Sequence, residues 1–166
     1  MAADLKWRGR LALIAAVLLA ACTALPAGEM LTENTGPDHA RIFLVRHAEK
    51  QAGEDPVLTP EGAVRAEALA VRLLGEDVTE IWSTRTNRTE QTAAPLASEL
   101  SLRVQTYDAS TLPAFASWLR ASPGVKLVVG HSNTTHALAA LLGAEPGPPI
   151  VEAKEFDRLY VIELGE

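Results

Sequence analysis

The strongest constraint on the fold is a short apolar run, residues 42–45 (Ile-Phe-Leu-Val), followed at once by Arg46 and His47. Four successive apolar residues without alternation are typical of a strand buried on both faces, as in a parallel sheet. Such a strand needs helices on both sides of its sheet. Because ligands collect at the carboxyl ends of strands in these sheets, we expect Arg46 and His47 to face a ligand.

Strand-like and helix-like segments alternate from residue 41 to the end of the chain. We expect strands at residues 41–45, 79–84, 102–107, 125–130 and 158–164, with helices at 60–74, from about 88, at 113–121 and from 133 to 142. Thr59 suits the N-cap and Pro60 the first position of the first helix, whose apolar face should include Val64 and Val71. A proline at position 95 predicts a kink in the second helix. The alternation predicts an α/β fold with three layers, a mostly parallel sheet covered by helices on both faces.

The chain has 166 residues and a net charge of −6. This length suits one compact domain, and the acidic balance gives no indication of a nucleic-acid-binding protein, which should carry a basic patch. The sequence indicates no oligomeric state.

The N-terminus resembles a bacterial lipoprotein signal peptide. Lys6, Arg8 and Arg10 precede an apolar stretch, residues 11–21, which is too short to span a membrane comfortably. The single cysteine, Cys22, follows directly in Leu-Ala-Ala-Cys, which resembles the motif at which such peptides are cut and the cysteine is acylated. A buried core cysteine or an uncleaved anchor are the alternatives.

This interpretation divides the chain into a signal peptide (1–21), a flexible tether (22–40) and a folded domain (41–166). The mature protein is then exported, lipid-anchored and facing the periplasm. Thr23 after the cysteine resembles the pattern for sorting to the outer membrane.

Four cationic or imidazole side chains follow three of the expected strands: Arg46, His47, Arg88 and His131. Each alone is more often structural or solvated than functional. Together on one rim they would repel each other unless an anion binds between them. Arginine pairs bind phosphate or carboxylate bidentately, and a helix capped by Asn133 adds backbone amide donors. The pattern therefore predicts a phosphate site formed by these four residues and Asn133.

Four motifs in order resemble the histidine phosphatase (phosphoglycerate mutase-like) superfamily, in particular its compact phosphohistidine-phosphatase-like members. They are VRHAEK (45–50), LTPEG (58–62), STRTNRTEQTA (83–93) and VVGHSNT (128–134). The resemblance covers about residues 41–163. It implies that His47 is the nucleophile, that Arg46 and Arg88 bind phosphate, and that His131 binds phosphate and stabilises the transferring charge.

A neutral imidazole can attack phosphorus, and water can then hydrolyse the phosphohistidine, so we expect neither a metal nor another cofactor. The sequence offers two candidates for the general acid. Mutase-like members use a glutamate on an insertion for which this chain is too short. Asp108 after the third strand is the first candidate and Glu49 the second, and each could equally be a solvated or paired carboxylate.

The sequence thus predicts an exported phosphatase that acts on phosphomonoesters or phosphoramidates. The alternative is a non-catalytic phosphate-binding or regulatory protein that uses the same pocket. Possible substrates are a phosphorylated small molecule, a glycan or lipid head group, or a phosphoprotein. Without an acid, substrates with good leaving groups are favoured.

Overall fold

The computed structural model of the protein describes residues 39–165. The predicted signal peptide, Cys22 and nearly all of the predicted tether lie outside the described residues. Their assignment stays a prediction. Among residues 39–165, no helix has both the length and the apolar character needed to cross a membrane.

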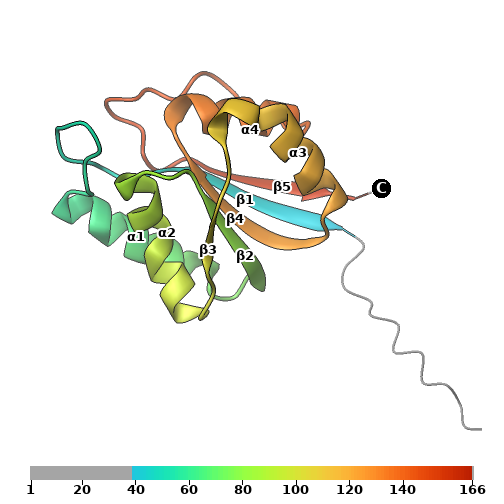
Figure 1. Ribbon diagram of the computed structural model, residues 1–166, viewed down its shortest axis with the longest axis horizontal. Helices are drawn as coiled ribbons and strands as arrows, with labels where there is room; N and C mark the ends of the chain where they lie inside the picture. Colours follow the sequence, from blue (N-terminus) through green and yellow to red (C-terminus); the bar gives the residue numbers. More distant parts are fainter. Residues whose placement is uncertain (1–38, 166) are drawn as a thin grey trace, which may run out of the picture. The chain divides into compact units, whose positions relative to one another are not determined.

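Strands and helices alternate along the described chain as the sequence predicts (Figure 1). The elements are β1 (Ala40–Arg46), α1 (Pro60–Leu73), β2 (Val78–Ser83), α2 (Asn87–Glu99), β3 (Val104–Thr106), a 3-10 turn (Ala109–Thr111), α3 (Leu112–Ala121), β4 (Gly124–Gly130), α4 (Ser132–Leu141) and β5 (Leu159–Leu164). The side chain of Thr59 accepts from the Gly62 amide and caps α1, with Pro60 as its first residue.

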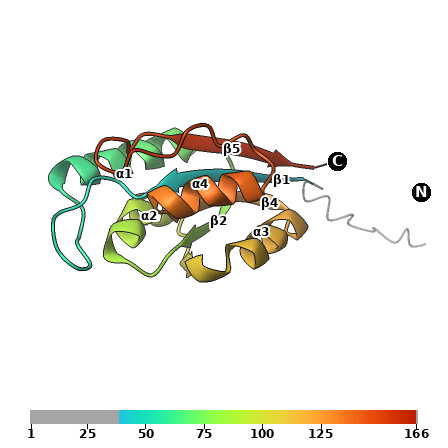
Figure 2. The ribbon, with the colours of Figure 1, turned by 90° about the horizontal axis from the view of Figure 1, so that it is seen from above.

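The five strands form one sheet in the order β3-β2-β4-β1-β5. β1 through β4 are mutually parallel, whereas β5 pairs antiparallel with β1 at the edge, as Figure 2 shows. The mostly parallel α/β fold predicted from the sequence is confirmed. An antiparallel edge strand is common on such sheets.

The central strand β1 is buried on both faces. Phe43 and Val45 pack into a cluster with residues of α1 and α2, and Ile42 and Leu44 pack into a second cluster with residues of α3 and α4. Each of these four side chains is at most 6% exposed. Helices therefore cover both faces, which explains why the apolar run of β1 shows no alternation.

The connections after β1 and β4 diverge. β1 leads into α1 on one face of the sheet, whereas its neighbour β4 leads into α4 on the other face. Adjacent parallel strands whose connections part in this way leave a crevice beyond their carboxyl ends, where ligands bind in α/β sheets. This crevice is where Arg46, His47 and His131 lie.

The predicted apolar face of α1 is wrong in part. Val64 and Val71 are 70% and 71% exposed, and the helix instead buries Ala66, Ala70 and Leu73. Ala66 and Ala70, small residues four positions apart, let α1 approach its neighbours closely. Periodicity alone does not show which apolar side of the helix is buried, so it wrongly predicted that Val64 and Val71 face the core.

The start of one helix also differs from the sequence-based expectation, and the predicted kink at Pro95 stays a prediction. α4 begins at Ser132, and His131, not Asn133, is its N-cap residue. The side chain of Thr134 accepts from the backbone amide of His131 at 2.8 Å, which fixes the start of the helix at this residue. α2 is a single helix that continues across Pro95.

Candidate active site

The register of β1 and β4 brings the two predicted histidines together. Arg46 pairs with Gly130, and the amide of His47 donates to the Gly130 carbonyl at 2.9 Å. His47 and His131 are therefore the next residues on two adjacent strands. Their ring centroids lie 5.6 Å apart. The sheet, rather than flexible loops, fixes this spacing.

Arg46 is the last residue of β1 and is only 3% exposed. Its Nη1 donates to the carbonyl of Glu155 at 2.9 Å, and its guanidinium carbon lies 4.2 Å from the centre of the Phe156 ring. Its buried Nε has no hydrogen-bond partner among the described residues. Burial lowers the pKa of Arg46, although Glu152 and Glu155 oppose the shift.

Arg88, the second residue of α2, approaches from the other side of the crevice. Its Nη2 lies 3.4 Å from Nδ1 of His131, and its Nη1 lies 3.5 Å from Oδ1 of Asp55. Like Arg46, it keeps a buried Nε without a partner in the described part of the chain. Buried donors are nearly always satisfied in folded proteins, so two such guanidinium groups in one crevice fit an anionic ligand.

The protonation of His47 follows from its contacts. Nδ1 lies 2.7 Å from the carbonyl oxygen of Ala48. A carbonyl can only accept, so Nδ1 carries the proton and Nε2 keeps its lone pair. Burial, assisted by the charges of Arg46, His131 and Arg88, lowers the pKa of His47 to about 4. His47 is thus a neutral imidazole at pH 7 with a free Nε2, which is the form a nucleophile needs.

His131 is held at both ring nitrogens. Nε2 lies 2.9 Å from Oγ1 of Thr84, and Nδ1 faces the Arg88 guanidinium. Because a guanidinium only donates, Nδ1 accepts and Nε2 donates to the threonine hydroxyl. Burial first, and then the charges of Arg88 and Arg46, lower the pKa of His131 to about 4.

The two predicted general acids have different surroundings. Asp108 lies in a hollow with Thr84, Arg85 and His131, but it is fully exposed and its carboxylate accepts from the side chain and amide of Ser110, which lowers its pKa. Its role as an acid stays a prediction.

Glu49 is committed to another partner. Arg65 donates to both of its carboxylate oxygens, at 2.6 to 3.0 Å, and these bonds lower its pKa. An ion-paired carboxylate is a poor proton donor, so Glu49 is the weaker candidate.

Asn133 is exposed as the second residue of α4. It adds its backbone to the helix N-terminus beside His131, and its role in substrate binding stays a prediction. Arg85, an exposed loop residue, faces the hollow that Asp108 and His131 also line.

Several residues around the site had no distinct signal in the sequence. Thr84 contacts His131, and Asp55 contacts Arg88. The side chain of Thr92 accepts a hydrogen bond from the backbone amide of Ala48 at 3.0 Å. Glu155 and Phe156 come from the irregular segment before β5, where no periodicity marks them. Only Thr84 and Thr92 lie inside a recognisable motif.

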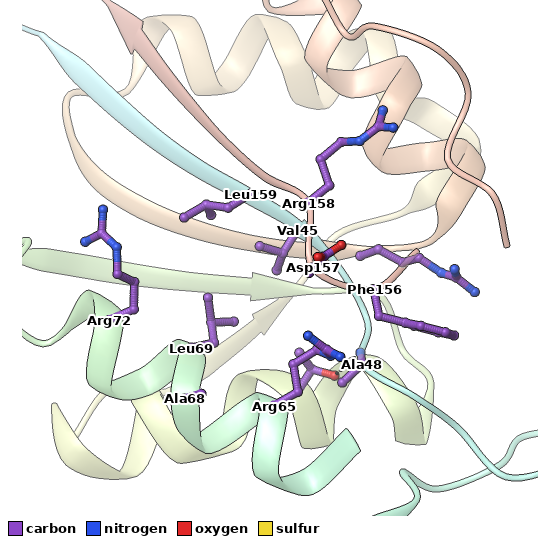
Figure 3. A pocket seen from close by; sticks show the side chains of 12 residues that line it. Val45, Ala48, Arg65, Ala68, Leu69, Arg72, Phe156, Asp157, Arg158 and Leu159 are labelled. Atoms are coloured by element: carbon purple, nitrogen blue, oxygen red, sulfur yellow. Dashed lines mark hydrogen bonds between the residues drawn. The ribbon is translucent and has the colours of Figure 1, made fainter. Parts of the chain in front are cut away.

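A cavity of about 220 Å³ adjoins the crevice. Leu69 of α1 and Val45 and Leu159 of the neighbouring strands form its apolar part, and Phe156 and Arg65 lie at its end nearest Ala48 (Figure 3). Among residues 39–165, no group of three or more His, Cys, Asp or Glu side chains is placed to hold a metal ion.

Comparison with known proteins also indicates a class of enzyme that acts on phosphate groups. Residues 42–110 match the model of the histidine phosphatase superfamily, branch 1. The matched residues contain three of the four motifs, so this part of the chain resembles the histidine phosphatase superfamily. A comparison with curated proteins found no match.

Solved structures share the fold. A provisionally named phosphohistidine phosphatase from Nakamurella multipartitia is 24% identical, with a TM-score of 0.56, over 75% of this chain and 84% of that one. A provisionally named alpha-ribazole-5'-P phosphatase from Escherichia coli is 16% identical, with a TM-score of 0.63, over 76% and 91%. A mycobacterial glucosyl-3-phosphoglycerate phosphatase is 18% identical, with a TM-score of 0.55, over 65% and 82%.

Proposed function

We propose that the protein is a phosphatase that works through a phosphohistidine on His47. The observation that carries this proposal is the pairing of a neutral, oriented imidazole with two arginines whose buried Nε atoms have no partner in the described chain. An anion binding site alone would not need the nucleophile. In a histidine phosphatase, the arginines bind the phosphoryl oxygens and Nε2 of His47 faces phosphorus.

The reaction has two displacements. Nε2 of His47 forms a bond to phosphorus while the bond from phosphorus to the leaving oxygen or nitrogen breaks. The positive charge on the imidazole is stabilised by the Nδ1–H bond to the Ala48 carbonyl. Water then attacks phosphorus, the bond to Nε2 breaks, and inorganic phosphate leaves. Arg46, Arg88 and His131 stabilise the charge of the transferring group in both steps.

The leaving group needs a proton in the first step. Asp108 is the proposed donor on the basis of its position in the hollow beside His131. Its lowered pKa leaves it mostly ionised near neutral pH, so substrates whose leaving groups need little help should react fastest. Phosphoramidates and aryl phosphates meet this condition. We propose that no metal takes part.

The substrate lies among phosphomonoesters and phosphoramidates. The similar structures are named for acting on a phosphohistidine, a ribazole phosphate and a glucosyl phosphoglycerate, so the fold accommodates different leaving groups. We propose a phosphate on a large carrier, such as a protein side chain, a glycan or a lipid head group, because no connection within residues 39–165 holds an additional domain that could cap the crevice.

The test is a panel of phosphorylated substrates with the full-length protein in detergent, in the presence and absence of EDTA. Wild type should release phosphate under both conditions, and Arg88→Ala should lower kcat/KM by about a hundredfold or more, since it removes a charged ligand from the transition state. Tight phosphate binding without any turnover would instead support the alternative of a non-catalytic binding protein.

We also propose that the protein is exported and anchored through acylated Cys22, on the basis of the basic n-region, the apolar stretch and the Leu-Ala-Ala-Cys sequence. Intact-mass measurement should find residues 1–21 absent from the mature protein and lipid on Cys22. Cys22→Ser should accumulate with residues 1–21 still attached. Wild-type protein that retains Met1 and carries no lipid would contradict the proposal.

A further inference from the structure

Residues 151–158, between α4 and β5, pass directly over the guanidinium of Arg46. The Glu155 carbonyl accepts from Arg46, and the segment is fastened on both sides of that contact. The amide of Val151 donates to the Glu155 side chain at 3.1 Å, and Arg158 pairs with Glu155 and donates to the Pro148 carbonyl at 2.7 Å. These bonds fix the residue between them, Phe156.

The ring of Phe156 contacts the two residues that begin the chemistry. Its centre lies 4.2 Å from the guanidinium carbon of Arg46 and 6.3 Å from the centre of the His47 ring. The first distance is a close cation–π contact, and the second is within the range of tilted aromatic pairs. Phe156 is thus a lateral wall of the crevice.

The cavity shown in Figure 3 lies along the same wall. Its lining includes Arg46 and Ala48, which flank His47, as well as Val45 and Phe156. Shortening the Phe156 side chain would therefore enlarge this cavity toward the crevice and bring water closer to Arg46 and His47.

We propose that Phe156 is a positioning residue that holds the Arg46 guanidinium toward bound phosphate and keeps water away from the ring of His47. The inference rests on the proposed phosphatase function and adds a role for a segment outside the four motifs. Phe156 acts through Arg46 and His47 and takes no part in bond formation.

Loss of the Phe156 ring should change the pKa of His47. Arg46 of β1, Arg88 of α2 and His131 after β4 face it, and Glu152 and Glu155 of the segment lie near Arg46. Burial is the first cause of the lowered pKa of His47. Removing the Phe156 ring hydrates the imidazole and leaves those charges in place, so the pKa of His47 should move up toward its ordinary value.

The test compares Phe156→Ala and Phe156→Leu with wild type and with Val161→Ala, a change at an exposed position of the neighbouring strand β5. The pKa of His47 is measured by NMR titration of its ring protons. Affinity for inorganic phosphate is measured in the same samples, and kcat and KM are measured with p-nitrophenyl phosphate. Thermal melting shows whether each variant is folded.

Phe156→Ala should raise the pKa of His47 by about one unit and weaken phosphate binding about fivefold to tenfold. Phe156→Leu should keep most of the pKa shift, because it keeps apolar bulk, but should still weaken phosphate binding several-fold. Val161→Ala should match wild type. An unchanged His47 pKa in Phe156→Ala, or unchanged phosphate affinity in Phe156→Leu, overturns the inference.

The two proposals fail separately in this design. If wild type binds phosphate but turns over no substrate, and the His47 pKa still differs between wild type and Phe156→Ala as expected, the phosphatase proposal is contradicted and the role of Phe156 is supported. If wild type is active but the Phe156 variants match it in His47 pKa and phosphate affinity, the phosphatase proposal is supported and the role of Phe156 is contradicted.

Discussion

The hydroxyl of Thr84 lies 2.9 Å from Nε2 of His131 and fixes the tautomer of that ring. Since the threonine hydroxyl accepts a hydrogen bond from Nε2–H, Nδ1 keeps its lone pair toward Arg88. Thr84 comes from the loop after β2 and His131 from the end of β4, so this bond joins two neighbouring strands at the candidate site.

Thr84→Val should therefore lower kcat about tenfold, because the loss of one buried hydrogen bond frees His131 to rotate or change tautomer. Thr84→Ser keeps the hydroxyl and should retain most of the activity. Steady-state kinetics with p-nitrophenyl phosphate measures both. Equal activity in the valine and serine variants would show that the hydroxyl does not orient His131.

Two buried histidines also predict how stability depends on pH. The pKa values of His47 and His131 are lowered to about 4, whereas a histidine in the unfolded chain titrates near 6.5. Between these values the unfolded chain binds more protons, so the free energy of unfolding is highest above pH 6.5 and falls as the pH drops toward 4.

Urea denaturation at several pH values between 7 and 4 measures this dependence. His47→Gln should flatten the curve, since it removes one of the two titrating groups. A wild-type curve that stays level from pH 6.5 to 4.5 would contradict the buried, neutral state of both imidazoles.

Gly62 provides a test of how the nucleophile segment is supported. A β-carbon at this position would overlap the carbonyl oxygen of Glu49, two residues after His47, whereas Gly75 has free space around the same position. Gly62→Ala should destabilise the fold by about 3 kcal/mol and lower activity, because residues 47–50 must shift. Gly75→Ala should change neither quantity appreciably, and thermal melting with kinetics compares the two.

Asp108 can be tested through its dependence on pH and leaving group. Because its pKa is lowered, its acid form becomes abundant only as the pH falls. Asp108→Asn should therefore slow alkyl phosphates more than aryl phosphates, and the difference should grow from pH 7 to pH 5. An equal effect on both substrate types at every pH would remove Asp108 from the mechanism.

The sequence predicts the frame of this protein well for a physical reason. The unbroken apolar run of β1, and the motifs after β1, β2 and β4, are local patterns, and a parallel sheet necessarily brings the ends of its strands to one edge. The positions of His47, Arg46, Arg88 and His131 follow from this geometry.

Other features depend on tertiary contacts. The burial of Ala66 and Ala70 in place of Val64 and Val71 reflects which side of α1 meets the rest of the fold, and periodicity does not decide this when both sides carry apolar residues. Phe156 lies in a segment without regular structure, and its place beside the site depends on tertiary contacts such as the bond from Arg46 to the Glu155 carbonyl.

The central claim is that Nε2 of His47 becomes phosphorylated. Rapid quenching of wild type with labelled substrate in EDTA, followed by peptide mapping, measures it most directly. We predict label on His47 in a linkage that is labile to acid and stable to alkali, and none in His47→Ala, which should bind phosphate but not turn over. Label on a serine or aspartate, or turnover that survives His47→Ala, would contradict the account.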